Sequence, residues 1–253
     1  MTGLRSAEAA ANEHQFRIND GYPVFATATV IQNGPGLTYF APHSNETIAQ
    51  QCGKDAVRQH GGKFVYLTHP GGERDITVNY EGKRYVFDPN RIFTDLGAAA
   101  SLHNLSGIYP DHIIKGVRTF AQQIVALIGE PPPGAPVVGL HNNTAAGPYS
   151  INSYTPGGIF AHDASKVYVN RQKNEHDLFF TTVPLYFDEL KARGYNVALQ
   201  SDKVTDDGSL SVYCAQKRIP YVNIDALNAP TGYQEQMKMI DVVISISLNR
   251  EDG

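Results

Sequence analysis

The chain alternates between short β-prone apolar runs and longer stretches with the apolar spacing of an amphipathic helix. The clearest helix is predicted over residues 110–128. Its apolar residues recur every three or four positions and would form one buried face, made of Ile113, Ile114, Val117, Phe120, Ile124 and Leu127. Further helices are predicted at residues 45–60, 184–193, 210–216 and 233–248.

Strands are predicted between these helices, at residues 22–31, 37–41, 63–68, 76–80, 84–87, 137–141, 166–170, 195–200 and 219–225. Because strands and helices alternate along the chain, we expect an α/β three-layer sandwich, with a mixed central sheet flanked by helices. The chain has 253 residues and no linker rich in Gly or Ser. We therefore expect a single domain over residues 1–253, with its core at about residues 20–250.

Three short polar motifs stand at the ends of apolar runs, namely residues 43–46 (HSNE), 88–91 (DPNR) and 141–144 (HNNT). His43 and Glu46 fall where a predicted strand passes into a helix, so both side chains can reach one ion. His141 ends the predicted strand 137–141, and ligands of open α/β sheets gather at the carboxyl ends of strands. Two imidazoles and one carboxylate form one of the ligand sets of catalytic zinc.

Each motif alone also has an ordinary structural explanation. A His beside a Glu is commonly a solvated pair, and Arg91 after Pro89 fits an exposed arginine that follows a turn. The order of the three motifs and the long gap between Glu46 and His141 favour a joint interpretation as a zinc site.

With these motifs the chain resembles the aspartoacylase and succinylglutamate desuccinylase branch of the zinc carboxypeptidase clan, whose members carry HxxE, DxNRxF and a strand ending in LHNT. The matching segments are 43–46, 88–93 and 140–144, within a resemblance that covers roughly residues 35–230. It implies one zinc ion per chain, held by three residues: His43, Glu46 and His141.

The same resemblance implies that Asn90 and Arg91 hold a carboxylate of the substrate. Arginine suits this role because its planar guanidinium donates two parallel hydrogen bonds to a carboxylate. Asp88 would orient either Arg91 or a histidine that binds zinc.

The family also places an arginine shortly before the Asn-Arg pair, where it stabilises the developing oxyanion. Arg84 fits this role best, although its distance to Asn90 is one residue shorter than in aspartoacylase. Lys83 is the alternative, and a surface strand with alternating side chains is the ordinary explanation of the segment.

The family's general base is a glutamate near the end of a late strand, and Asp225 stands there in this chain. Asp225 is shorter by one methylene, so either the site is adjusted to it or another carboxylate acts, for which Glu175 and Asp177 are candidates. A third possibility is that Asp225 only caps the turn that follows the strand.

The loop of residues 145–158, rich in Gly, Pro, Ser, Asn and Tyr, follows His141 closely and is expected to cover the metal. Tyr149 and Tyr154 lie in this loop. Either tyrosine would donate a hydrogen bond to the substrate or pack the loop down.

Composition excludes some partners. The chain has 21 Lys and Arg against 25 Asp and Glu, a net charge of −4, without a dense basic run, so we expect no binding to nucleic acid. No apolar run approaches the ~20 residues of a membrane span, so no membrane insertion is expected. Cys52 and Cys214 lie in predicted helices as buried thiols, with a disulfide as the alternative.

The polar start, residues 1–8, lacks the pattern of a signal peptide, so we expect none within this sequence, and the start could equally follow a removed signal. Low Lys and high Asn, Thr and Tyr contents favour a periplasmic or secreted protein after signal removal, with the cytoplasm as the alternative compartment.

These features together predict a zinc-dependent hydrolase of an amide bond next to a free carboxylate, acting on a small molecule or a peptide. Aspartoacylases carry a C-terminal β-domain that narrows the channel, and too few residues follow Asp225 for such a domain. A more open site favours a carboxypeptidase-like peptidase. The alternatives are an N-acyl amino acid deacylase and a catalytically silent protein that binds zinc and a peptide.

Overall fold

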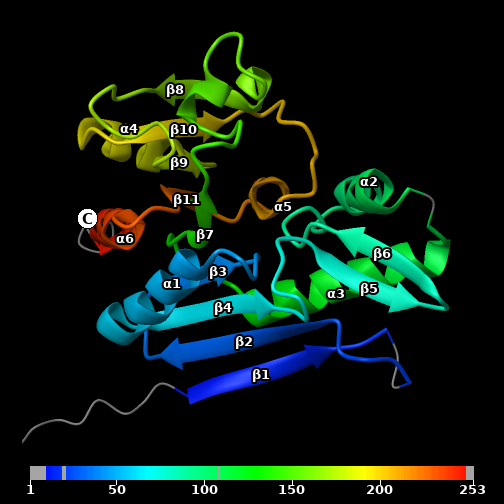
Figure 1. Ribbon diagram of the computed structural model, residues 1–253. Helices are drawn as coiled ribbons and strands as arrows, with labels where there is room; N and C mark the ends of the chain where they lie inside the picture. The colour runs from blue at the N-terminus through cyan, green and yellow to red at the C-terminus, as the bar shows by residue number, and fades with distance from the viewer. Residues whose placement is uncertain (1–9, 19–20, 108, 249–253) are drawn as a thin grey trace, which may run out of the picture.

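A computed structural model describes residues 10–18, 21–107 and 109–248 (Figure 1). Within these residues, nine strands form one mixed sheet in the order β1-β2-β4-β3-β7-β11-β9-β10-β8. Their bounds are β1 Ala10–Phe16, β2 Ala26–Asn33, β3 Thr38–Ala41, β4 Gly62–Thr68, β7 Val137–Asn143, β8 Ala164–Tyr168, β9 Leu178–Thr181, β10 Asn196–Gln200 and β11 Tyr221–Leu227. A separate hairpin joins β5 (Ile76–Tyr80) to β6 (Lys83–Phe87).

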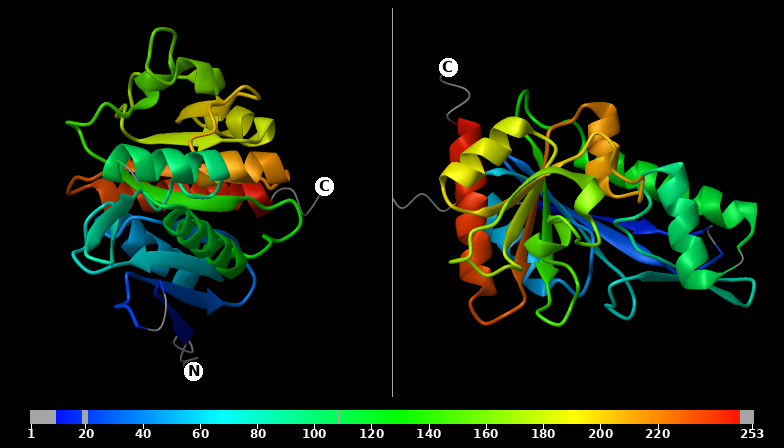
Figure 2. Two further views of the ribbon diagram at one scale, coloured as in Figure 1. Left: turned by 90° about the vertical axis from the view of Figure 1, so that its right-hand side faces the viewer. Right: turned by 90° about the horizontal axis from the view of Figure 1, so that it is seen from above.

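Helices cover both faces of the sheet (Figures 1 and 2). Their bounds are α1 Thr47–His60, α2 Asp95–Ser106, α3 Asp111–Ile128, α4 Pro184–Ala192, α5 Leu210–Lys217 and α6 Gly232–Leu248, with short 3-10 turns η1 Ile151–Tyr154 and η2 Ala161–Asp163. The buried residues of α1, α4 and α6 pack on one face, while those of α2, α3, α5 and the hairpin pack on the other. The predicted three-layer α/β fold is confirmed.

The direction of the strands explains where the polar motifs meet. β4, β3, β7 and β11 run parallel to one another at the centre of the sheet. The carboxyl ends of parallel strands lie at the same edge, and His141 of β7 is paired there with Asp225 of β11. His43 follows the end of β3 at this edge.

The helix predicted at residues 110–128 forms as α3, and its apolar face packs against the sheet. The buried positions are Ile113, Val117, Phe120, Ala121, Ile124 and Ile128. The ring of Phe120 contacts Phe16, Phe25 and Phe87 edge to face, with centroid separations of 4.7 to 6.1 Å. Cys52 and Cys214 are free thiols buried in the clusters on opposite faces of the sheet, so they form no disulfide.

Two glycines allow a close approach that shapes one wall of the site. A Cβ on Gly97 of α2 would lie 2.0 Å from the Cα of Gly208, and a Cβ on Gly208 would lie 2.4 Å from the carbonyl oxygen of Arg91. Gly208 also has a φ of +77°, which disfavours residues with a side chain. The loop before α5 is therefore held directly against Arg91.

Two strands, β1 and β9, and one α-helix, α2, were absent from the sequence-based prediction, as were the 3-10 turns η1 and η2. The predicted strand 22–31 begins only at Ala26, and the strand predicted at 166–170 is β8, Ala164–Tyr168. The remaining predicted elements are present with small shifts at their ends. The polar start, residues 1–8, lies outside the described residues.

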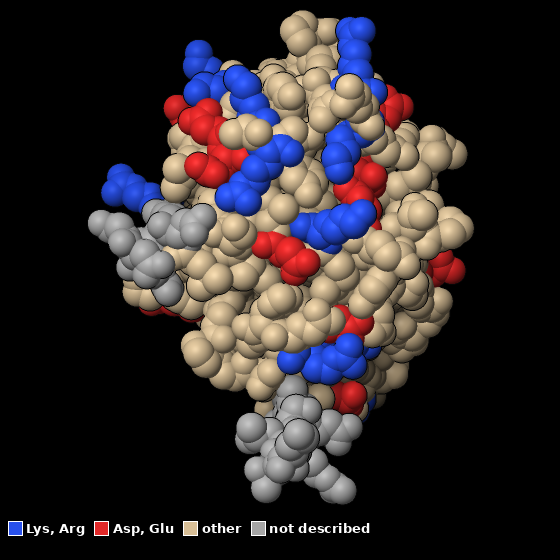
Figure 3. Space-filling view, turned by 90° about the vertical axis from the view of Figure 1, so that its left-hand side faces the viewer, with Lys and Arg blue, Asp and Glu red and all other residues tan. Residues whose placement is uncertain are grey.

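The surface view in Figure 3 shows Lys and Arg side chains interspersed with Asp and Glu on that face of the molecule. This distribution matches the small net charge of −4. Among the described helices, none has the length and apolar character needed to cross a membrane.

Candidate metal centre and active site

His43, Glu46 and His141 lie together at the carboxyl edge of the central strands. One ligand atom from each lies within 4.8 Å of the others, and all three residues are buried. Glu46 bridges the two imidazoles, with Oε1 at 2.8 Å from His43 Nδ1 and Oε2 at 3.1 Å from His141 Nδ1. Two imidazole nitrogens and one carboxylate converge here in a buried space. They are of the type and number of protein ligands that a catalytic zinc ion takes.

Asp88 contacts His43 on the ring nitrogen that does not face Glu46. Its Oδ1 lies 3.0 Å from His43 Nε2, on the opposite side of the ring from Glu46. A carboxylate at Nε2 holds the proton there, which leaves the lone pair of Nδ1 for a metal ion. Asp88 also accepts a hydrogen bond from the backbone N–H of Asn90, so it fixes the turn after β6 at the same time.

The charges of this group depend strongly on one another. Burial raises the pKa of Glu46, but the nearby His43 and His141 lower it well below its usual range on balance. Burial lowers the pKa of His43, while Glu46 and Asp88 raise it on balance. The carboxylates are thus held ionised next to the imidazoles, as a cation site requires.

His141 is fixed by a polar network that ties the end of β7 to two helices. Its carbonyl oxygen accepts hydrogen bonds from Gln236 Nε2 of α6 at 3.0 Å and from Asn142 Nδ2 at 3.1 Å. The side chain of Asn142 also accepts from the backbone N–H of Ala49 in α1, at 2.9 Å.

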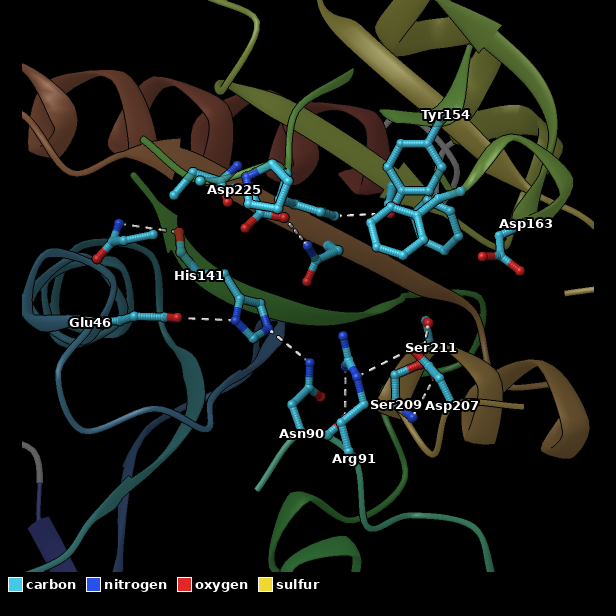
Figure 4. Close-up of a pocket in the computed structure, with 18 of the residues that line it drawn as sticks. Glu46, Asn90, Arg91, His141, Tyr154, Asp163, Asp207, Ser209, Ser211 and Asp225 are labelled. Carbon is cyan, nitrogen blue, oxygen red and sulfur yellow. Dashed lines mark hydrogen bonds and ion pairs between the residues drawn. The ribbon is translucent and has the colours of Figure 1, made fainter. Parts of the chain in front are cut away.

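Asp225 projects from β11 into a cavity that Glu46 and His141 also line (Figure 4). Along this strand Tyr221, Asn223 and Asp225 line the cavity, while Val222 and Ile224 pack in the core. Asn223 Nδ2 donates a hydrogen bond to Asp225 Oδ2. Burial raises the pKa of Asp225 to about 6, and His141 opposes that rise.

The two alternative carboxylates are engaged elsewhere. Glu175 accepts a hydrogen bond from Asn152, and Asp177 accepts one from the backbone N–H of Leu227 at 2.7 Å. Neither residue lines the cavity that contains Asp225.

Asn90 and Arg91 line the cavity on the side of the hairpin. Asn90 Nδ2 lies 3.5 Å from His141 Nε2. Arg91 is oriented by two contacts: Nε lies 3.3 Å from Asp207 Oδ2, and Nη1 donates to the carbonyl oxygen of Asn90 at 3.1 Å. The side chain of Arg91 points into the cavity (Figure 4).

The structure does not bring Arg84 to this group. Arg84 is exposed on the hairpin, where Nη2 donates to Thr77 Oγ1 at 3.2 Å, and neighbouring Lys83 is also exposed. The arginine beside the ligands is Arg74, whose Nη1 lies 2.8 Å from Glu46 Oε1 and 3.3 Å from His43 Nδ1. The β5–β6 hairpin lies between Arg74 and Asn90 in the sequence. Arg74 therefore does not stand shortly before Asn90, where the sequence-based prediction looked for the arginine.

Tyr149 and Tyr154 form the aromatic wall of a cavity of about 570 Å³. Their hydroxyls lie 3.0 Å apart, and burial raises the pKa of both phenols above the usual range. His176 Nδ1 contacts the carbonyl oxygen of Tyr149 at 3.0 Å, which anchors the loop. The loop expected near the metal therefore contributes to the wall of this cavity.

Sequence reasoning missed three charged residues of the cavity: Arg74, Asp163 and Asp207. Arg74 lies in a polar segment, GGER, whose two glycines mark a loop between predicted strands and were the available signal. Asp163 ends the short η2 turn and Asp207 lies in an irregular segment, and only the fold brings them to the cavity that Arg91 also lines.

No family model matches the sequence, and no curated protein matches it. A solved structure with some likeness is the product-bound structure of the ectoine utilization protein EutE (DoeB) from Ruegeria pomeroyi. The match has a TM-score of 0.45 and 12% identity, and it covers 96% of this chain and 69% of that chain.

Proposed function

We propose that this protein is a zinc-dependent hydrolase that cleaves the amide bond of an N-acyl amino acid, next to the free carboxylate of the amino acid. The observation that supports the proposal is the content of a single cavity. It is lined by Glu46 and His141, two of the three candidate zinc ligands, together with a further carboxylate, Asp225, and two arginines, Arg74 and Arg91. The third candidate ligand, His43, lies 2.8 Å from Glu46.

The metal ligands would be His43 Nδ1, His141 Nδ1 and the carboxylate of Glu46, the atoms that face one another in the buried space. Bound zinc supplies a Lewis acid for the scissile carbonyl and lowers the pKa of a water molecule. Asp88 and the Asn142–Gln236 network hold the two histidines in position for it.

Arg91 and Asn90 bind the carboxylate of the substrate. Asp207 and the carbonyl oxygen of Asn90 occupy Nε and one N–H of Nη1, so the guanidinium is held in one orientation before the substrate arrives. Its remaining N–H groups then form the charge-assisted pair that a carboxylate accepts. This anchor places the neighbouring amide at the metal centre.

Asp225 acts as the general base, which takes a proton from the attacking water and passes it to the leaving nitrogen. With a pKa of about 6 its carboxylate is largely ionised at neutral pH. Arg74, which contacts Glu46 at 2.8 Å, is the donor next to the metal centre that would stabilise negative charge on the carbonyl oxygen.

A carboxypeptidase-like activity on peptides is the second candidate, because a C-terminal residue offers the same carboxylate and amide. The cavity is bordered by Asn45 and Thr144, both exposed, so it reaches the surface on that side. A longer acyl group or a peptide could enter there. The volume of about 570 Å³ is enough for a whole N-acyl amino acid.

The experiment is a hydrolysis screen of zinc-loaded protein with N-acetyl amino acids, their carboxamides and N-acetyl dipeptides. We expect cleavage of free acids and loss of most activity on the carboxamides. Asp225→Asn should bind zinc but lower kcat about 10²- to 10⁴-fold. Absence of hydrolysis by a zinc-loaded protein that still binds N-acyl amino acids would favour the silent binding protein, and faster cleavage of dipeptides would favour the peptidase.

A further inference from the structure

Two polar side chains precede Asp225 on the same face of β11, and the proposed chemistry does not use them. Tyr221, Asn223 and Asp225 alternate with core residues and line the cavity. All three residues are buried. A buried hydroxyl and a buried amide therefore stand in a row that ends at the proposed base.

Hydrogen bonds connect the three side chains in sequence. The hydroxyl of Tyr221 lies 3.1 Å from Asn223 Oδ1, and Asn223 Nδ2 donates to Asp225 Oδ2. The direction of these bonds follows from the last residue. An ionised carboxylate only accepts hydrogen bonds, so the amide turns its NH₂ group to Asp225. The amide oxygen then faces Tyr221, whose hydroxyl donates to it.

A glycine on the neighbouring strand makes room for this row. Gly139 of β7 is paired with Asn223 across the sheet, as His141 is with Asp225. A Cβ on Gly139 would lie 2.1 Å from the hydroxyl oxygen of Tyr221 and 2.8 Å from Asn223 Oδ1. The ring of Tyr221 is packed in the core and has little room to move aside. Any side chain at position 139 would therefore displace the contact between the hydroxyl and the amide.

The row restricts the rotation of the Asp225 carboxylate. The last torsion of an aspartate side chain has broad minima, so a carboxylate without partners can turn its oxygens in many directions. Asn223 holds Oδ2 from the same strand, and Tyr149 adds a hydrogen bond from the loop. Orientation is important for a base, because a misplacement of about 1 Å can lower the rate about a hundredfold.

We propose that Asn223, itself oriented by Tyr221, is a positioning residue that holds the carboxylate of Asp225 toward the attacking water. This inference rests on the proposed function for the role of Asp225 as the base. Because Asn223 acts through Asp225, a change at Asn223 lowers kcat and leaves KM and the affinity for zinc as they are.

The first test compares two buried tyrosines. Tyr221→Phe removes one oxygen and should lower kcat about fivefold, the equivalent of one hydrogen bond, with KM and zinc affinity unchanged. Tyr39→Phe is the matched control, because the buried hydroxyl of Tyr39 has no hydrogen-bond partner within the described part of the chain. It should keep the kcat of the parent protein. Equal kcat values for the two variants would overturn the role of Tyr221.

The second test removes the donor to the base. Asn223→Leu should lower kcat about 10- to 100-fold without a change in KM. In the background of Asp225→Asn, the same change should lower kcat no further, because its effect passes through Asp225. A rise in KM that accounts for the loss, or an equal loss in both backgrounds, would overturn the inference. Tyr221→Phe keeps the proposal testable if Asn223→Leu does not fold.

A spectroscopic measurement separates this inference from the proposed function. In ¹⁵N-labelled, zinc-loaded protein, the side-chain amide of Asn223 is assigned by its absence from Asn223→Leu. We expect one of its protons to be shifted downfield by the carboxylate, and Asp225→Ala should abolish the shift. If no amide substrate is cleaved, that result still supports Asn223 as the residue that orients Asp225. A shift that survives Asp225→Ala would overturn the inference, and hydrolysis with a kcat independent of Asn223 would keep the hydrolase and reject the positioning role.

Discussion

The Oδ1 atom of Asp88 lies 3.0 Å from Nε2 of His43, while Nδ1 of the same ring faces Glu46 at 2.8 Å. The histidine is therefore held between two carboxylates, one on each ring nitrogen. We infer that Nδ1 would be the metal-binding atom and that Asp88, which is not in the group of three candidate ligands, would orient the ring for the metal.

Asp88→Asn should weaken zinc binding about 10- to 100-fold, because the amide keeps an acceptor for the turn but loses the charge that orients His43. Competition with a chromophoric chelator measures the affinity. The matched variant Asp111→Asn, in the first turn of α3, should bind zinc like the parent protein. Equal zinc affinities of the parent protein and Asp88→Asn would show that Asp88 does not contribute to zinc binding.

Arg91→Lys keeps the positive charge but cannot present a planar pair of donors. We expect it to raise the KM for N-acyl amino acids by an amount equivalent to about 1 to 3 kcal/mol, with a smaller effect on their carboxamides. Steady-state kinetics on matched acid and amide substrates measures the difference. If both substrates lose the same factor, Arg91 does not recognise the carboxylate.

Activity should fall as the pH drops through the acid range. The base must be ionised, and burial raises the pKa of Asp225 to about 6, although a zinc ion nearby would lower it. The acid limb of kcat/KM should therefore lie at or somewhat below pH 6, and Asp225→Asn should abolish it together with most of the activity. A profile with the same acid limb in Asp225→Asn would assign the base elsewhere.

Stability should depend on the contact between α1 and α6. The hydroxyl of Tyr233 donates to Asp55 Oδ2 at 2.8 Å, and Gln51 donates to the same oxygen at 2.9 Å. Burial raises the pKa of Asp55, but these hydrogen bonds and Arg58 lower it on balance. A lowered carboxyl pKa stabilises the fold above the unfolded value of about 3.9, and this contribution disappears as the pH falls through the folded value.

Tyr233→Phe should accordingly lower the free energy of unfolding at pH 7 by about 1 to 2 kcal/mol. The difference from the parent protein should begin to shrink below about pH 4 and disappear as the pH falls through the lowered pKa of Asp55 in the folded state. Urea denaturation at several pH values measures both effects. Tyr66→Phe, which removes a hydroxyl from a ring stacked on Phe64, serves as control. If the loss of stability does not change with pH, the contribution of Tyr233 does not depend on the charge of Asp55.

The sequence was sufficient to place residues that stand directly at the ends of regular elements. Strongly patterned segments flank three such residues: His43, Glu46 and His141. The fold class therefore predicted that these residues lie at the same edge of the sheet. Asp225 was chosen because the family resemblance implies a carboxylate near the end of the strand predicted at residues 219–225, and it lines the cavity from β11. These positions depend on local pattern and on the direction of parallel strands, and both can be inferred from the chain.

The missed features lack such a pattern. Residues 11–15 of β1 are exposed and polar apart from Ala11, so this edge strand shows no alternation. All four residues of β9 are buried, and α2 has little contrast between its faces. Arg74 and Asp207 reach the cavity only through the hairpin and the Gly97–Gly208 contact, which are tertiary features.

The most direct test of the account is an anomalous difference map from crystals of zinc-loaded protein, recorded at the zinc absorption edge. We expect one strong peak per chain, within about 2.0 to 2.2 Å of His43 Nδ1, His141 Nδ1 and a carboxylate oxygen of Glu46. Arg74 Nη1, which lies 2.8 Å from Glu46 Oε1 in this structure, should lie farther from that oxygen when zinc is bound. A map without a peak between these three residues, with Arg74 still bound to Glu46, would contradict the account.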